Sequence, residues 1–408
     1  MIQNLDWWLF LALAPVVYWL APLRIRAGLL AGISLAIVLA MAPFEMTMML
    51  GLALLVYGVF ALQDGPAVAA AGRLQALLPK RLSQARRSTW LFLIVLIYLF
   101  WYKYTPQLAF YLMKDKGLAD LVPPIGISYF SFKLMHYALE RGRGTLPAHT
   151  IQTFLCWMFL MPTFTSGPIE RFDHFLHNTE TRFRIGLVVE GGTRIVQGLV
   201  KRFVLVDQLA RVAGHYTGPD LVAFAHGMGG QQGAFAVWAY LAIALIVLYL
   251  DFSAYSDMAI GVCRLFGFRI MENFDYPLLA PNLTEFWRRW HMSLTNWCRA
   301  YVYMPVIGLT RNPYTAVIAT FVLVGLWHAG TIHWLAWGLW HGVGQAISLH
   351  WARFAQRRKI TFFKTRTGKV AGWALTMAYV MLGGSLVAFY HAGRFLDSFW
   401  LMGRAFGG

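Results

Sequence analysis

Acidic, basic and imidazole side chains gather in the run Glu285–Ser293, which reads EFWRRWHMS. On a helix, Glu285 and Arg289 would be four residues apart and could form an ion pair on one face. Arg288 and His291 would be three apart on a neighbouring face. An imidazole exchanges protons near pH 7, so this run could serve acid–base chemistry. An amphipathic interfacial helix with aromatic anchors and snorkelling arginines is the alternative interpretation.

A second histidine, His328, ends an apolar stretch that starts at Thr320, and His333 and His341 follow it. Gly330 and other small residues near His328 allow a substrate or a backbone to approach closely. A neutral imidazole there could take a proton from a hydroxyl, which is the step that acyl transfer to an alcohol needs. A histidine that only packs is the alternative.

Two carboxylates, Asp251 and Asp257, follow another apolar run. Six residues of helix turn through about 600°, so the two side chains would lie on nearly opposite faces. They are therefore not expected to act as a catalytic dyad. We expect one of them to pair with Arg288 or Arg289 in a structural role.

The sequence lacks the motifs of several other enzyme classes. The chain has no GxSxG elbow, no phosphate-binding P-loop and no HExxH zinc motif. The spacings of the histidines match no metal motif and carboxylate partners are scarce, so no metal is expected. The three cysteines have no CxxC partner and are expected to be small buried hydrophobes.

The elements that must position these residues are membrane helices. Of 408 residues, 58% are hydrophobic and 13% charged, whereas soluble domains have about 25% charged residues. The pattern predicts an all-α polytopic membrane protein with roughly nine to twelve membrane segments and a single domain over 1–408. Spans are expected near 6–22, 28–43, 45–62, 89–112, 150–165, 232–252, 314–330, 331–350 and 370–391. Less regular apolar stretches lie near 121–139, 186–212 and 253–267.

The net charge of +17 comes from basic residues between the apolar runs. Such loops are typical of the cytoplasmic side of a membrane and can contact anionic headgroups. No nucleic-acid-binding module surrounds them. Residues 1–21 lack a basic start and are expected to remain as a first membrane helix. One cluster is Arg73, Lys80, Arg81, Arg86 and Arg87; the other is Arg353, Arg357, Arg358, Lys359, Lys364, Arg366 and Lys369.

Between about residues 120 and 345 the chain resembles the membrane-bound O-acyltransferase family. Each motif alone is weakly specific, but together and in the family's order they are highly specific. The motifs are PIGISYF from Pro124, DFSAYSDMAIG from Asp251, ENF from Glu272, TEFWRRWHMS from Thr284 and GLWH from Gly325.

Two bacterial branches of the family compete. The segment from Pro162 to Phe172 is similar to the D-alanyl transfer proteins that decorate teichoic acids. The stretch from Asp251 through His341 looks more like the acetyltransferases of alginate, cellulose and peptidoglycan. The resemblance favours the D-alanyl branch slightly over the acetyl branch.

The resemblance implies a ring of helices around a thinned funnel in the bacterial inner membrane. There a cytoplasmic thioester donor, either an acyl carrier protein with its phosphopantetheine or acetyl-CoA, would meet a hydroxyl acceptor. His328 matches the family's invariant histidine, and His291 matches its second conserved histidine. Ala329 stands where the family usually has glycine. No tightly bound cofactor is implied, and a membrane-anchored or periplasmic partner transferase is expected.

We therefore expect His328 and His291 to be catalytic, with His328 as general base or positioning group and His291 assisting. A transporter, or a scaffold that only docks a separate transferase, remains an alternative, although no paired interrupted helices are visible. The expected supporting or substrate-binding residues are Arg288, Arg289, Asp251, Asp257, Glu285, Ser293, Trp327 and His341.

Overall fold

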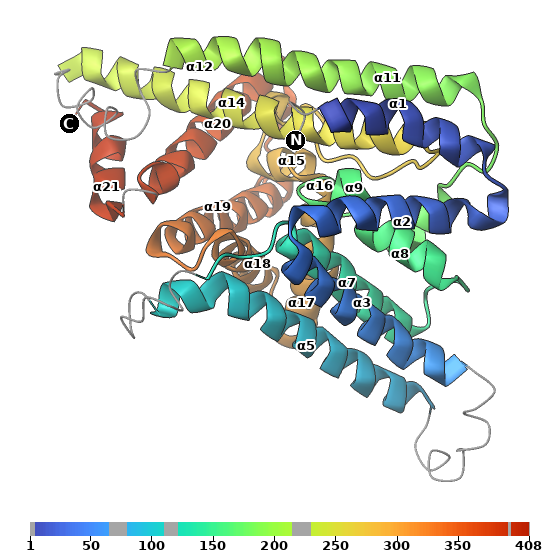
Figure 1. Cartoon of the computed structure of the whole chain (residues 1–408). Helices are drawn as coiled ribbons and strands as arrows, with labels where there is room; N and C mark the ends of the chain where they lie inside the picture. Colours follow the sequence, from blue (N-terminus) through green and yellow to red (C-terminus); the bar gives the residue numbers. More distant parts are fainter. Residues whose placement is uncertain (1–4, 65–79, 110–120, 214–229, 391–392, 408) are drawn as a thin grey trace. The chain divides into compact units, whose positions relative to one another are not determined.

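The computed structural model describes residues 5–64, 80–109, 121–213, 230–390 and 393–407 (Figure 1). Within them the chain is helical with no strand, and the only β pairing is an isolated bridge between Thr179 and Phe268. This confirms the expected all-α membrane fold. The helices are α1 (Leu5–Leu20), α2 (Leu23–Met41), α3 (Pro43–Asp64), α5 (Lys80–Leu108), α7 (Ile127–Arg143), α8 (Ile151–Phe159), α9 (Met161–Phe164), α10 (Phe172–His177), α11 (Ile185–Leu199), α12 (Asp207–Ala213), α14 (Gly230–Leu265), α15 (Leu283–Arg289), α16 (Met292–Cys298), α17 (Met304–Thr310), α18 (Pro313–His328), α19 (Ile332–Arg357), α20 (Arg366–Ala388) and α21 (Phe395–Arg404).

Two compact units make up the chain. The first contains residues 1–196 and 256–271, and the second contains residues 197–255 and 272–408. The single domain expected from the sequence stays a prediction, and each unit is described by itself.

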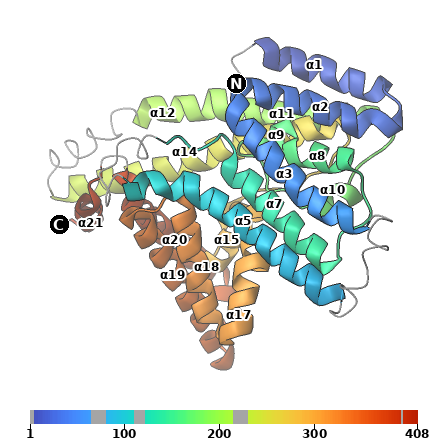
Figure 2. The same cartoon turned by 60° about the horizontal axis from the view of Figure 1, so that its bottom comes forward.

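In the first unit, α5 lies along α7, and α2 lies along α8 (Figures 1 and 2). Helix α7 is buried on almost every side, because aromatic residues such as Phe130 and Tyr137 face neighbours all round it. Trp157 and Phe172 pack against Tyr137, with ring centroids 6.4 and 5.6 Å away. The core of this unit is therefore largely aromatic.

The expected single span over 150–165 is wrong, since α8 ends at Phe159 and the short α9 starts at Met161. Pro162 is the second residue of α9 and has no N–H to continue the hydrogen-bond ladder of α8. The ammonium group of buried Lys133 donates to the carbonyl oxygens of Trp157 (2.5 Å) and Met158 (3.2 Å). These carbonyls lie in the last turn of α8, where a positive charge is favourable.

In the second unit, α18, α19 and α20 lie side by side (Figure 2). Helix α15 packs on α19, and its residues Phe286 and Trp287 join Met377 and Val380 of α20 in a buried cluster. Helix α14 contributes to both units. Its 36 residues join the separately expected stretches 232–252 and 253–267, because no proline or glycine interrupts them between residues 234 and 260.

Five helical segments in the described residues are long and apolar enough to cross a membrane. Two shorter apolar helices, Leu11–Leu20 and Pro313–His328, also match expected spans. The ring of nine to twelve membrane helices and the central funnel stay predictions. The five segments are Leu23–Met41, Pro43–Ala61, Gln84–Leu108, Gly233–Leu265 and Arg366–Ala388.

Candidate active site

The hairpin of α18 and α19 is held together by direct contact between helix backbones. A Cβ atom built on Gly338 would lie 2.6 Å from the carbonyl oxygen of Phe321 and 3.0 Å from the Cα of Val322. A Cβ built on Gly342 would lie 3.0 Å from the Cα of Ile318. Glycines four residues apart let two helices approach more closely than any side chain would allow. Gly338 and Gly342 therefore set the distance between α18 and α19.

His328 is the last residue of α18, and its side chain is exposed. The rings of three tryptophans surround it. Trp334 stacks on the imidazole with a centroid distance of 4.3 Å and an interplanar angle of 20°. Trp327 and Trp337 lie 4.6 and 5.7 Å away. The imidazole is thus fixed by packing while a substrate can still reach it.

The other candidate histidines of this unit are buried, which separates them from His328. His291 is 5% exposed, His333 4% and His341 1%. A reacting group must meet its substrate, so exposure distinguishes the four histidines more sharply than their spacing did.

His291 does not share a helix with Arg288, so the expected common face for these two residues is wrong. Helix α15 ends at Arg289, and His291 has a left-handed φ of +44° immediately before α16. Such a conformation is uncommon outside glycine and is often retained at functional sites.

The imidazole of His291 packs against Phe252 (4.7 Å between centroids) and lies nearly parallel to Trp327 at 6.5 Å. Trp327 therefore contacts both predicted catalytic histidines. Burial lowers the pKa of His291, which keeps its ring neutral at physiological pH. Among the described residues its Nε2 has no hydrogen-bond partner.

A short network fixes the turn at His291. Ser293 donates through its hydroxyl to the side-chain oxygen of buried Asn273 at 2.6 Å. The backbone N–H of Met292 donates to the carbonyl oxygen of Asn273 at 2.9 Å. The supporting role expected for Ser293 stays a prediction. Asn273, which was not among the expected site residues, is the group that holds the turn from the other side.

The expected pair of Glu285 and Arg289 is confirmed, with 3.5 Å between Arg289 Nε and Glu285 Oε2. Arg288 lies closer to the same oxygen, at 2.5 Å from its Nη2. Asn282 caps the helix by accepting a hydrogen bond from the N–H of Glu285. Both arginines therefore share one carboxylate at the start of α15.

The expected partners of Asp251 and Asp257 are wrong. Arg202 lies 3.2 Å from Asp251, and Arg194 lies 2.9 Å from Asp257. Arg194 lies in α11, and Arg202 lies in the π-helical segment Val200–Val206 that continues it. Both are far from α15 in the sequence. These ion pairs form because the segment that begins with α11 lies beside α14. Residue spacing along one helix does not predict which other helix lies beside it.

His341 packs edge-on to Trp287 at 4.9 Å and against Trp337 at 4.6 Å. Its buried Nδ1 has no hydrogen-bond partner in the described part of the chain. A Cβ built on Gly383 of α20 would lie 2.7 Å from His341 Nε2, so a glycine is needed there. His341 is a packed interior group one layer behind His328, because Trp337 contacts both rings.

Trp334 and Trp337 were not expected as site residues, although a signal for them exists. Trp334, Trp337 and His341 follow the spacing i, i+3, i+7, which places them on one face of α19. That face contacts His328. No group of three histidine, cysteine or carboxylate side chains suited to a metal is found among the described residues.

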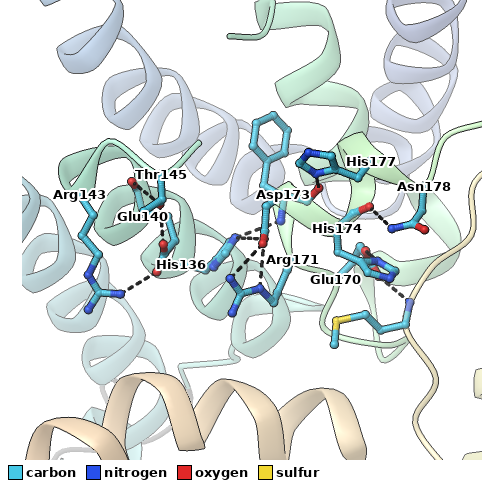
Figure 3. A network of polar contacts seen from close by, with 12 residues as sticks. His136, Glu140, Arg143, Thr145, Glu170, Arg171, Asp173, His174, His177 and Asn178 are labelled. Atoms are coloured by element: carbon cyan, nitrogen blue, oxygen red, sulfur yellow. Dashed lines mark hydrogen bonds and ion pairs between the residues drawn. The ribbon is translucent and has the colours of Figure 1, made fainter. Parts of the chain in front are cut away.

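A second polar network lies in the first unit (Figure 3). Glu170, from the PIERF segment, is fully buried and accepts from the N–H of Met271 at 2.7 Å. Its other oxygen lies 2.5 Å from His174 Nδ1. The hydrogen bond with Glu170 raises the pKa of His174, while burial raises the pKa of Glu170. This carboxylate thus ties α10 to the segment that follows α14.

The neighbouring part of the same network holds the first residues of α10 in place. His136 of α7 accepts a hydrogen bond at its Nε2 from the N–H of Phe172, 3.0 Å away. Arg171 forms two hydrogen bonds with Asp173, at 3.0 and 3.1 Å. Figure 3 shows these side chains converging on the turn before α10. The PIERF segment is therefore a structural junction of the first unit.

Comparison with known proteins agrees with these motifs. Residues 80–392 match the family described as MBOAT, membrane-bound O-acyltransferase. The chain is 36% identical over 281 residues to a probable alginate O-acetylase of Pseudomonas aeruginosa, a match that covers 66% of this chain and 50% of the relative. It is 31% identical over 353 residues to a teichoic acid D-alanyltransferase of Streptococcus thermophilus, covering 79% of this chain and 80% of the relative.

A peptidoglycan O-acetyltransferase of Helicobacter pylori is 31% identical over 188 residues, covering 45% of this chain and 33% of the relative. The chain spans about half the length of the alginate O-acetylases that it matches. The family match covers well over half of the chain and includes every motif around His291 and His328. The chain therefore belongs to the membrane-bound O-acyltransferase family.

Proposed function

We propose that this protein transfers an acyl group from a thioester donor to a hydroxyl of a cell-envelope polymer at the bacterial inner membrane. The observation that carries the proposal is the position of His328. It combines an exposed imidazole, a fixed orientation between three tryptophans and the family's GLWH motif.

In the proposed reaction His328 accepts the proton of the acceptor hydroxyl as its oxygen attacks the thioester carbonyl. The carbon–sulfur bond then breaks, and the imidazolium returns the proton to the departing thiolate. The ester and the free thiol are the only products, so no bound cofactor is consumed. His291, kept neutral by burial, supports the geometry through Trp327.

Acetyl is the acyl group that we favour, because identities to the alginate O-acetylases reach 38%, whereas those to the D-alanyltransferases are 28% and 31%. D-alanyl is the second candidate. It is supported by the match that covers four fifths of both this chain and the Streptococcus thermophilus relative. An acyl carrier protein or acetyl-CoA would be the donor, and a partner transferase would complete the transfer to the polymer.

The test uses the purified protein in nanodiscs with three labelled donors: acetyl-CoA, an acetylated carrier protein and a D-alanylated carrier protein. The variant is His328→Ala, and the matched control is His350→Ala, another exposed histidine, whose ring lies beside Tyr314. We expect label to leave an acetyl donor in the wild type and the control, and the variant to lose at least about 10²-fold in rate.

Transfer only from the D-alanylated carrier would replace the acetyl proposal by the D-alanyl one. Equal rates for the wild type and His328→Ala would refute the catalytic role of His328. If membranes that contain a partner transferase acylate the polymer equally well with either form, the scaffold alternative would gain support. Passage of an intact solute across proteoliposomes without acyl transfer would favour a transporter.

A further inference from the structure

Positive charge is concentrated in residues 351–369, which include the end of α19, the residues that join it to α20 and the start of α20; this stretch is called the connection below. No aspartate or glutamate occurs anywhere from residue 286 to residue 396. None of the seven basic side chains of the connection has a carboxylate within ion-pair distance in the described structure. By contrast, Arg264 pairs with Glu180 and Glu190. The seven are Arg353, Arg357, Arg358, Lys359, Lys364, Arg366 and Lys369.

Large aromatic side chains lie among these cations. Trp351 is 43% exposed, Phe354 40%, Phe362 51% and Phe363 41%. Trp351 contacts Phe354 and Phe363, with centroids 5.6 and 6.0 Å apart. The aromatic rings thus form one exposed cluster rather than four scattered side chains. An exposed aromatic cluster of this kind marks a surface that meets a partner or a membrane.

The connection has a defined shape. Lys364 donates its N–H to the carbonyl oxygen of Thr361 at 2.8 Å, which closes a short 3₁₀ turn over Phe362–Lys364. Thr365 caps α20 by accepting from the N–H of Gly368 at 3.1 Å. A segment long and apolar enough to cross a membrane starts at Arg366, so the connection borders a candidate span.

We propose that residues 351–369 bind the phosphate groups of anionic phospholipids at the membrane surface. The aromatic cluster inserts at headgroup depth, where such rings are enriched, and the unpaired cations contact the lipid phosphates around it. Acidic protein surfaces would satisfy the cations but would leave four large apolar rings without an apolar environment. An anionic phospholipid therefore suits both the cations and the aromatic rings. This inference does not depend on the proposed catalytic activity.

The test measures the thermal midpoint of the whole protein in a neutral detergent during titration with phosphatidylglycerol or phosphatidylcholine. Glutamines replace four cations in the test variant: Arg357→Gln, Arg358→Gln, Lys359→Gln and Lys364→Gln. Arg353 is kept because it donates to the hydroxyl of Tyr314 at 3.1 Å. The matched control loses four other exposed arginines: Arg24→Gln, Arg182→Gln, Arg211→Gln and Arg299→Gln.

We expect phosphatidylglycerol, but not phosphatidylcholine, to raise the midpoint of the wild type and of the control. The apparent affinity of the test variant should fall on the order of 10³-fold, and added salt should weaken wild-type binding. Phe362→Ser with Phe363→Ser should keep the preference for anionic lipid but reduce the size of the shift.

An unchanged response of the four-cation variant would overturn the proposal, as would an equal loss in the control. Free inorganic phosphate that reproduces the full shift would show an anion site without lipid recognition. A polyglutamate peptide that binds more tightly than the lipid would make the partner an acidic protein.

Discussion

Replacing Gly338 with alanine would place a methyl group between the backbones of α18 and α19. Its Cβ would lie 2.6 Å from the carbonyl oxygen of Phe321 and 3.0 Å from the Cα of Val322. Ordinary van der Waals contact begins at 3.4 Å, and the Cβ would lie only 2.6 Å from the Phe321 oxygen. The helices must therefore separate by about 0.8 Å. Both obstructing atoms belong to the backbone, so no side-chain rotation can relieve the overlap.

Overpacking of this kind costs about 1–3 kcal/mol, and alanine's higher helix propensity offsets about 1 kcal/mol of it. The larger effect should be on the rate. Trp334 and Trp337 are carried by α19, whereas His328 is carried by α18, so separation moves the imidazole away from its supports. A misplacement of about 1 Å can reduce an enzyme's rate about 10²-fold, and we expect a loss of that order.

The assay compares acyl transfer and the thermal midpoint of Gly338→Ala with those of Gly384→Ala in α20. A Cβ on Gly384 would meet no atom within 4 Å, so the control makes the same chemical change without the overlap. Gly384→Ala should match or slightly exceed wild-type stability. The reasoning would be refuted if Gly338→Ala equalled this control in both rate and midpoint.

Three further predictions concern single side chains. Trp334→Leu should lower kcat roughly tenfold with little change in KM, because it removes the ring that stabilises the imidazolium, whereas Trp334→Phe should keep part of the rate; equal kcat in both variants and the wild type would contradict this. Asp257→Asn should lower the free energy of unfolding by about 3 kcal/mol, since Asp257 is 6% exposed and pairs with Arg194, and an unchanged thermal midpoint would argue against a stabilising pair. The raised pKa of His174 contributes stability that is fully present below its ordinary value of 6.5 and is lost as pH rises through the raised value. The midpoint should therefore fall less steeply in His174→Gln as the pH rises above 6.5, and parallel curves for variant and wild type would count against this role.

Hydropathy was sufficient to locate most of the helices. The spans expected at 314–330 and 331–350 correspond to α18 and α19, because an apolar run of this length can bury its backbone polar groups only as a helix. The buried state of all three cysteines is also confirmed. The break at Leu160 was missed, although Pro162 gave a local reason to expect it.

Interactions between distant segments were not predictable in the same way. One of Asp251 and Asp257 was expected to pair with Arg288 or Arg289. Their actual partners, Arg202 and Arg194, come from a different helical segment. No periodicity in one segment specifies which other segment will lie beside it. The exposed and buried states of the four histidines depend on packing for the same reason.

By itself, the sequence determined that this chain is a helical membrane protein of the O-acyltransferase family, and it predicted His291 and His328 as the catalytic candidates. These conclusions rest on composition, on apolar length and on residue order, all of which are properties of the chain alone. Only the tertiary structure decided that His328 is exposed within a tryptophan cage while His341 is buried behind it. The physical reason is that glycine contacts between α18 and α19 set a spacing that exists only when both helices are in place.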